Sequence, residues 1–231
     1  MSGFLHQFSR LEIKRRHLLK SAPEGPMRDY LSQPFPSRRK RYEELRYLAL
    51  DTETTGLDDL HDQILSIGYV PIDGLGIHLR DAAYHLVKPY REIPEQSVVI
   101  HGLTDDEVYS ADSIESVLPK VLKALKGRVL IAHYASLDLR FLGWACRRTY
   151  RCPLLVPVID TLDLEYRTMR HRNQYPKKGE MTLDALRVLY NLPRYRAHNA
   201  LSDALAAGEL FMAQASHRAG RRRLLFGDLA S

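Results

Sequence analysis

The order of the predicted strands and helices constrains the fold of this chain more than any other feature. Three apolar runs come first, at 47–50, 64–70 and 82–87, and short runs bounded by turn residues are typical of strands. Helical patterns then alternate with two further apolar runs, at 129–132 and 154–159. This order indicates an α/β fold in which a mixed β-sheet is flanked by helices.

Helical spacing of apolar residues follows the third strand. The stretch from Ile114 to Leu125 places its apolar residues on one face. Pro119 lies inside it, and an interior proline costs roughly 3 kcal/mol, so we expect a bend or a late start there. Further helices are predicted at about 137–146, from 161, from 182 and at 201–212.

The length of 231 residues, 45% of them hydrophobic, favours one main domain with extensions. The positive charge lies at the ends. Residues 1–44 carry ten Lys and Arg against five Asp and Glu, residues 217–231 carry four against one, and residues 45–216 therefore carry −2 of the total of +6. We divide the chain at these boundaries into a basic N-terminal extension and linker, a central domain and a basic C-terminal tail.

The N-terminal extension (1–44) combines a helical pattern with irregular sequence. Apolar residues at 4, 5, 8 and 11 predict a short amphipathic helix. Residues 21–41 contain four prolines and the basic run 38–41, which indicates an irregular linker, and we expect a solvated arm there. Basic arms suit a polyanionic partner such as nucleic acid, although they are equally common as solubility devices.

The two cysteines, Cys146 and Cys152, are too few for a disulfide framework or a four-ligand zinc site. We therefore expect a reducing, cytoplasmic location. No apolar run approaches the roughly 20 residues that span a bilayer, and the N-terminus lacks the apolar stretch of a signal peptide, so no membrane association is expected.

Two acidic residues follow the first predicted strand. Asp51 and Glu53 are two positions apart, so their side chains project from the same face of a strand. Two anions at a buried strand end are costly unless a cation neutralises them, and Mg²⁺ and Mn²⁺ prefer oxygen ligands. An isolated pair of this kind is more often a solvated strand end, so it indicates a metal site only together with further acids.

Two later segments supply such acids. Asp138 lies where a predicted strand leads into a helix, and Asp203 lies in the first turns of a later helix, five positions after His198. Asp138 alone could be an acid that complements the helix dipole, and Asp160 is interpreted as a helix cap rather than a ligand. Gathered at one place, the four acids would suffice for two metal ions about 3.5–4 Å apart.

Three motifs occur in order along the central domain: Asp51-Thr-Glu53-Thr-Thr-Gly56, Ala132-His133-x-Ala135-x-x-Asp138 and His198-Asn199-Ala200-x-x-Asp203. In order and spacing they resemble the motifs of the DnaQ-like, DEDDh 3′→5′ exonuclease superfamily, which includes the proofreading epsilon subunit of bacterial DNA polymerase III. The resemblance covers roughly 47–214 and implies a ribonuclease H-like fold. The second motif departs from the common His-Asn-Ala-x-Phe-Asp pattern, because Tyr134 replaces the Asn and Leu137 replaces the Phe.

The resemblance implies a site with two divalent cations, Mg²⁺ or Mn²⁺. Its metal ligands would be Asp51, Glu53, Asp138 and Asp203. His198 would be the general base, since a His has an ordinary pKa of about 6.5 and can accept a proton from water at neutral pH. Glu53 would have a further role at the terminal 3′ hydroxyl. These five residues form the predicted catalytic set.

Contacts with the substrate are predicted around this set, from Thr54, Thr55, Gly56, His101 and Tyr134. The backbone at 54–56 would lie against the last nucleotide, and Tyr134 would bind a phosphate or stack on a base. His101 would pack on the terminal sugar or base, but it is equally well interpreted as a histidine at a helix end.

These features predict a metal-dependent exonuclease that releases nucleoside monophosphates from the 3′ end of DNA. One alternative is an exoribonuclease, because the same metal site serves either backbone. Another is a catalytically idle accessory module of a polymerase or nucleotidyltransferase, docked through residues 1–44. Retention of all five motif residues argues against the idle module. The expected partners are a nucleic-acid 3′ end, DNA in preference to RNA, and a polymerase or other protein at the N-terminal extension.

Overall fold

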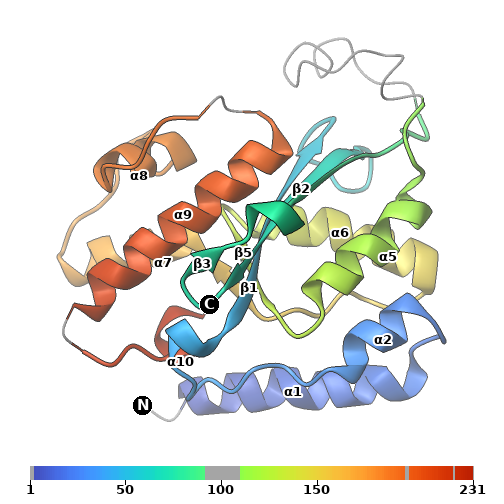
Figure 1. Cartoon of the computed structure of the whole chain (residues 1–231), viewed down its shortest axis with the longest axis horizontal. Helices are drawn as coiled ribbons and strands as arrows, with labels where there is room; N and C mark the ends of the chain where they lie inside the picture. The colour runs from blue at the N-terminus through green and yellow to red at the C-terminus, as the bar shows by residue number, and fades with distance from the viewer. Residues whose placement is uncertain (1–2, 92–109, 196–197, 221, 231) are drawn as a thin grey trace.

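The computed structural model describes residues 3–91, 110–195, 198–220 and 222–230, with side chains from residue 10 onward in the first range. Its described strands form one mixed sheet in the order β3-β2-β1-β5-β6, with β4 also paired to β2 (Figure 1). The pairs among β1 to β4 are antiparallel, whereas β1–β5 and β5–β6 are parallel. The strands are β1 (Arg46–Thr54), β2 (Ile64–Asp73), β3 (Gly76–Ile77), β4 (Ala83–Leu86), β5 (Val129–Ala132) and β6 (Val158–Asp160).

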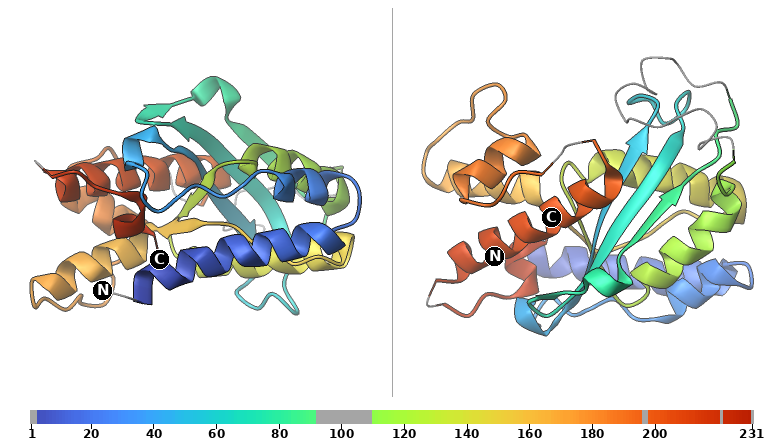
Figure 2. Two further views of the ribbon diagram at one scale, coloured as in Figure 1. Left: turned by 90° about the horizontal axis from the view of Figure 1, so that it is seen from below. Right: turned by 45° about the horizontal axis from the view of Figure 1, so that its top comes forward.

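Helices cover both faces of this sheet (Figure 2). The described helices are α1 (Gly3–Ser21), α2 (Pro26–Ser32), α5 (Ile114–Leu125), α6 (Ser136–Tyr150), α7 (Thr161–His171), α8 (Leu183–Leu189), α9 (Ala200–Ala219) and α10 (Phe226–Leu229), with 3₁₀ turns at Tyr42–Glu44 and Leu79–Asp81. The predicted α/β class, a mixed sheet flanked by helices, is confirmed. None of the helices described is both long and apolar enough to cross a membrane.

Alternation along β1 divides the core into two layers. Leu48 and Leu50 belong to a cluster with residues of α2, α5 and α6 on one face. Tyr47 and Ala49 belong to a second cluster, which includes Phe211 of α9, on the other face. Because successive strand residues point to opposite sides, this central strand is buried on both faces.

Helix α9 approaches the sheet unusually closely because glycines line the contact. A Cβ atom at Gly68 would lie 2.2 Å from the carbonyl carbon of Ala200 and 2.2 Å from the amide nitrogen of Leu201. On the helix side, a Cβ atom at Gly208 would lie 2.9 Å from the Cδ1 atom of Ile72. The absence of side chains at these two positions lets the helix backbone rest directly on β2.

The N-terminal segment is not a solvated arm, so that expectation is wrong. Helix α1 is longer than predicted, and α2 begins at Pro26, in the first turn where proline fits a helix. Tyr30 and Leu31 are buried in the core, and the Tyr30 hydroxyl donates to the carbonyl of Leu155 at 2.7 Å. The Arg15 guanidinium also donates to the carbonyl of Leu31. The proline-containing segment is therefore packed against the core, and Pro26 begins a helix there.

The C-terminal segment is also packed, although its sequence is basic. Phe226 and Leu229 of α10 are fully buried. Their backbone is held from two directions, because Arg38 donates to the Gly227 carbonyl at 2.7 Å and Arg167 donates to the Leu229 carbonyl at 2.6 Å. Described residues of both terminal segments thus belong to the same core clusters as the central strand β1, and the division of the chain at residues 44 and 217 stays a prediction.

Pro119 does not delay the start of its helix. Helix α5 begins at Ile114, after Ser113, and continues without interruption through Pro119 to Leu125. Of the two alternatives, the late start is therefore wrong and the bend stays a prediction.

Candidate active site

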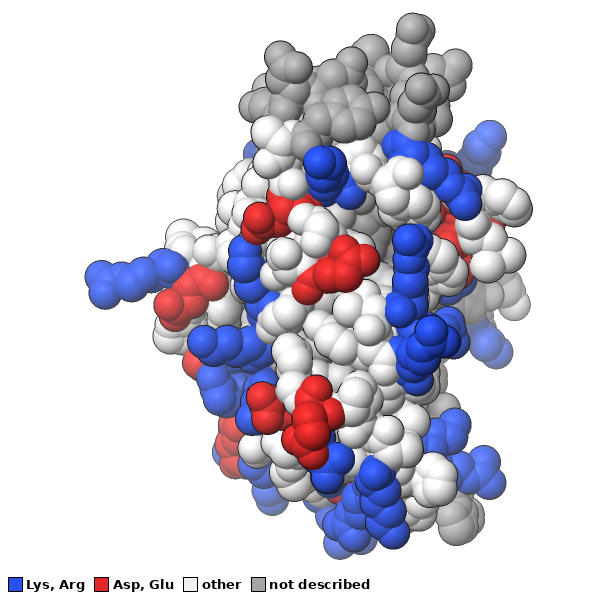
Figure 3. Space-filling model, turned by 90° about the vertical axis from the view of Figure 1, so that its right-hand side faces the viewer, with Lys and Arg blue, Asp and Glu red and all other residues white. Residues whose placement is uncertain are grey.

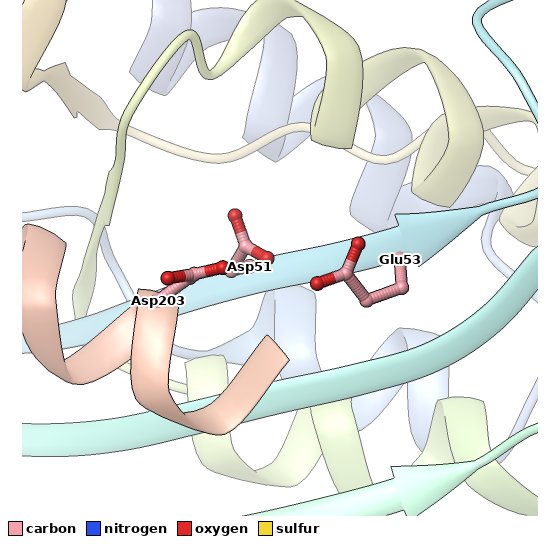
Figure 4. A group of neighbouring side chains, drawn as sticks. All are labelled: Asp51, Glu53 and Asp203. Carbon is pink, nitrogen blue, oxygen red and sulfur yellow. The ribbon is translucent and has the colours of Figure 1, made fainter. Parts of the chain in front are cut away.

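Three carboxylates come together where α9 meets β1. Strand β1 continues past its apolar run, so Asp51 and Glu53 lie on one face of a regular strand, and Asp203 lies in the first turn of α9. Figure 4 shows the three side chains converging from these two elements. One oxygen from each lies within 4.8 Å of the others. Gly68 makes this possible, because it pairs directly with Asp51 across the sheet and admits the end of α9.

Capping interactions orient Asp203. The side chain of Asn199 accepts a hydrogen bond from the backbone of Ser202 at 3.1 Å and so caps α9. The Asp203 carboxylate accepts the backbone N–H of His198 at 2.9 Å. His198 adopts a left-handed conformation, with φ 66°. The His198 side chain is exposed and lines a cleft of about 630 Å³ together with Asp51 and Glu53.

Asp138 stands apart from this group. It is buried at the start of α6 and accepts a hydrogen bond from the Thr52 hydroxyl at 2.7 Å. Thr52 lies between the two acids of β1 and points to the opposite face of the strand. Asp138 is still close enough to raise the pKa of Asp51 by electrostatic repulsion. The structure therefore joins three of the predicted ligands directly and places the fourth beside them.

The site concentrates negative charge at a cost to the metal-free protein. Burial, followed by repulsion from Asp138, Glu53 and Asp203, raises the pKa of Asp51 well above its ordinary range. Burial likewise raises the pKa of Asp138 to about 7, against the hydrogen bond from Thr52, and that of Asp203 to about 6. A bound cation would offset this repulsion, and carboxylate oxygens are suitable ligands for Mg²⁺ or Mn²⁺. The donor set therefore fits a hard divalent cation.

The second motif is held by Asp160, whose wider role the sequence did not reveal. Its carboxylate accepts the backbone N–H groups of Tyr134 at 3.0 Å and Ala135 at 2.9 Å, as well as that of Leu162 at 2.9 Å. The interpretation of Asp160 as a cap of α7 is confirmed. Its additional contact with the turn before α6 could not be predicted, because the partners lie about 25 residues away in the sequence.

His133 is also a structural residue. One ring nitrogen lies 2.8 Å from the Thr161 hydroxyl and the other lies 3.0 Å from the carbonyl of Met181. Tyr134, in contrast, has φ 63° and is 51% exposed. The ring of Tyr134 is therefore accessible from solvent and can contact a substrate. Both ring nitrogens of His133, in contrast, already have protein partners, which fix the ring in place.

The predicted substrate contacts of the first motif line the cleft. Thr54, Thr55 and Gly56 border it next to the two acids of β1. The Thr54 hydroxyl donates to the Gly56 carbonyl at 2.7 Å, and the Thr55 hydroxyl donates to Asp62 at 2.9 Å. Leu57 follows at the rim and is 70% exposed. His101 lies outside the residues that the structure describes.

Comparison with known proteins identifies the family. Residues 48–211 match the family model described as Exonuclease. The chain belongs to the RNase T exonuclease family. All five residues of the predicted catalytic set lie within the matched range, and the resemblance that we drew from the three motifs is confirmed.

Relatives and solved structures agree with this assignment. The chain is 35% identical over 172 residues to a PolC-type DNA polymerase III of Thermotoga petrophila, covering 74% of this chain but only 12% of that protein. It is 32% identical over 180 residues to the DNA polymerase III subunit epsilon of Treponema pallidum, covering 77% of this chain and 80% of that one. The structure of exonuclease X in complex with 5′ overhanging duplex DNA has a TM-score of 0.60 and 26% identity, over 79% of this chain and 98% of that chain.

These comparisons confirm two predictions from the sequence. The chain is an exonuclease, and it has the ribonuclease H-like α/β fold of this family. The PolC-type relative is much longer than this chain, which spans about an eighth of it.

Proposed function

We propose that the protein is a metal-dependent 3′→5′ exonuclease that releases nucleoside monophosphates from the 3′ end of DNA. The observation that carries the proposal is the convergence of the Asp51, Glu53 and Asp203 carboxylates within 4.8 Å. The relatives support DNA as the substrate, because two of them are named as DNA polymerase III proteins. We also propose that the cations are Mg²⁺ or Mn²⁺ and that two of them bind.

Each residue of the set has a distinct task in this proposal. Asp51, Glu53 and Asp203 would hold the cations, and Asp138 would complete the ligand set from the α6 side of β1. Bound cations supply a water of lowered pKa and stabilise charge on the leaving oxygen. The exposed imidazole of His198 would accept the proton of the attacking water at the cleft.

The cleft wall would position the terminal nucleotide. The backbone of 54–56 would lie against the nucleotide, and Glu53 would contact its 3′ hydroxyl. The exposed ring of Tyr134 would bind a phosphate or stack on a base. A protein partner such as a polymerase is proposed for the N-terminal extension. The basic side chains of Lys14, Arg16 and Lys20 on α1 of this extension are exposed.

Matched oligonucleotides test this function. Single-stranded DNA and RNA of the same sequence, labelled at either the 3′ or the 5′ end, are incubated with Mg²⁺. We expect the 3′ label to appear at once as a mononucleotide, whereas the 5′-labelled strand shortens stepwise and gives a ladder of products. DNA should be degraded faster than RNA. Asp203→Asn serves as the inactive control. Immediate release of the 5′ label as a mononucleotide would contradict the polarity, and faster degradation of RNA would favour the exoribonuclease.

A further inference from the structure

Helix α6 carries a stripe of cationic and aromatic side chains outside the catalytic cleft. Arg140, Trp144 and Arg148 are spaced four residues apart, so they lie on one face of the helix. Both arginines are exposed. Tyr90 stacks on Trp144, with the ring centroids 6.1 Å apart and the planes 18° from parallel. This face of the molecule thus presents two nearly parallel rings between cations.

Two of the cations here, Arg91 and Arg148, lie over aromatic rings, whereas Arg140 pairs with Asp59 at 3.5 Å. The Arg148 guanidinium lies 4.8 Å from the ring centroid of Tyr90 and 5.3 Å from that of Trp144. Arg91 lies 5.4 Å from the centroid of Tyr90. Within the described residues, Arg148 makes no hydrogen bond or ion pair, so its positive charge is not compensated. A guanidinium that stacks on a ring keeps its N–H groups available at the edge for phosphate oxygens.

Buried hydrogen bonds connect this region to the cleft. The side chain of Gln63 is 4% exposed, accepts the backbone N–H of Tyr90 at 2.9 Å and donates to the Arg91 carbonyl at 2.9 Å. Its backbone pairs with Thr55, which borders the cleft, at 3.0 Å. On the helix side, Arg140 donates to the carbonyl of Leu57 at 3.0 Å. The rings are therefore fixed to the loop that forms the cleft wall.

We propose that Tyr90, Arg91, Trp144 and Arg148 form a stacking platform for single-stranded nucleic acid on the 5′ side of the terminal nucleotide. Unpaired bases stack on exposed aromatic rings, and Tyr90 is 41% exposed. The arginines match the charge of the phosphates, which the acidic cleft itself repels. Figure 3 shows the side of the molecule where α5 lies, with Lys and Arg side chains spread over this face and Asp and Glu side chains in several separate groups among them. The position of the platform relative to the strand rests on the proposed function, which puts the 3′ end of the strand in the cleft.

Trp144 is the only tryptophan of the chain, so its fluorescence reports directly on the platform. We titrate the protein, in the presence of a chelator, with a 20-nucleotide single strand. We expect quenching as a base stacks on the indole, and an affinity roughly 5- to 100-fold lower in Trp144→Leu when the binding is followed by anisotropy. Arg148→Gln should weaken binding and lower the slope of log affinity against log salt by about 0.7.

Controls separate binding from folding. Arg80→Gln, an exposed arginine of the turn Leu79–Asp81, should bind like the wild type. Trp144→Tyr should restore binding, because it keeps a ring. Arg148→Gln should also keep the wild-type melting temperature, since its side chain is exposed. Wild-type affinity and salt slope in Arg148→Gln, or an unchanged Trp144 signal on saturation with the 20-nucleotide strand, would overturn the platform.

Turnover separates the platform from the catalytic proposal. In Arg148→Gln, we expect a raised KM for the 20-nucleotide strand, an unchanged kcat, and unchanged values of both for a trinucleotide, which is too short to reach far beyond the cleft. If the wild type releases no nucleotide from any strand, the proposed function fails, and the fluorescence titration still decides the platform.

Discussion

The close contact between α9 and β2 predicts that a single methyl group at Gly68 disables the site. In Gly68→Ala the new Cβ would lie 2.2 Å from backbone atoms of Ala200 and Leu201, whereas ordinary contact begins at 3.4 Å. Backbone atoms cannot rotate away as a side chain can. The end of α9 must therefore move by about 1 Å, because the contact is 1.2 Å shorter than an ordinary one. Asp203 lies two residues beyond this contact.

The size of the effect follows from that displacement. A misplacement of about 1 Å costs roughly 10²-fold in rate, and overpacking of this kind costs about 1–3 kcal/mol in the free energy of unfolding. We therefore expect kcat/KM on a 5′-labelled strand to fall about 100-fold, with a lower melting temperature but a folded protein by circular dichroism. Binding of Mn²⁺, measured by calorimetry, should weaken in parallel.

Two other glycines supply a graded control for this experiment. At Gly76 in β3 the nearest atom would be 3.6 Å from the new Cβ, so Gly76→Ala should leave the rate unchanged. At Gly208 the nearest atom is the end of the Ile72 side chain at 2.9 Å, so an intermediate effect is expected. A folded Gly68→Ala variant with a rate within about threefold of the wild type would refute the reasoning.

Three further predictions concern the charges of the site. Asp203→Asn should abolish hydrolysis. It should also abolish the stabilisation by Mn²⁺, yet raise the melting temperature of the metal-free protein at pH 8, because it removes a repelled anion; thermal melts with and without Mn²⁺ measure these two effects. His198→Ala should slow single-turnover cleavage by about 10²–10⁴-fold at pH 7.5 with little change in Mn²⁺ affinity, and a wild-type rate across pH 6–9 would exclude it as the base. Burial raises the pKa of Asp138 to about 7 and that of Asp203 to about 6, so their protonation stabilises the fold fully below pH 3.8 and this stabilisation is lost as the pH rises through 6–7. The melting temperature in chelator should therefore decline between about pH 4 and 7, and Asp138→Asn should reduce this decline. An equal decline in that variant would contradict the reasoning.

Local patterns were sufficient to predict the framework of the site. The alternation of side chains along β1 placed Asp51 and Glu53 on one face, and the spacing after His198 placed Asp203 in a first helical turn. Both depend on fewer than seven residues of sequence. The side of the strand on which Asp138 lies depends on how α6 packs against β1, and no local pattern encodes that contact. The hydroxyl of Thr52, which holds Asp138, was missed for the same reason.

The chain ends show the opposite case, where a local pattern misled. Four prolines and a basic run predicted a solvated arm at 21–41, but proline fits the first turn of a helix, and Pro26 lies in the first turn of α2. Phe226 and Leu229 lie in a basic segment, and two apolar residues there were not sufficient to predict a buried helix. One contact that holds this segment comes from Arg38, which is 189 residues away from its hydrogen-bond partner Gly227.

The distribution of charge explains why the proposed platform and the catalytic group belong together. A cleft that gathers Asp51, Glu53 and Asp203 repels a phosphate backbone, so the metal-free cleft cannot itself supply affinity for a nucleic acid. Cations bound there would reverse this repulsion for the terminal nucleotide alone. Affinity for the rest of a long strand must then come from elsewhere. The described residues offer uncompensated Arg148 beside two stacked rings, which hydrogen bonds of Gln63 and Arg140 connect to the loop that forms the cleft wall. It follows that a chelator should remove the binding of a trinucleotide while a 20-nucleotide strand still binds.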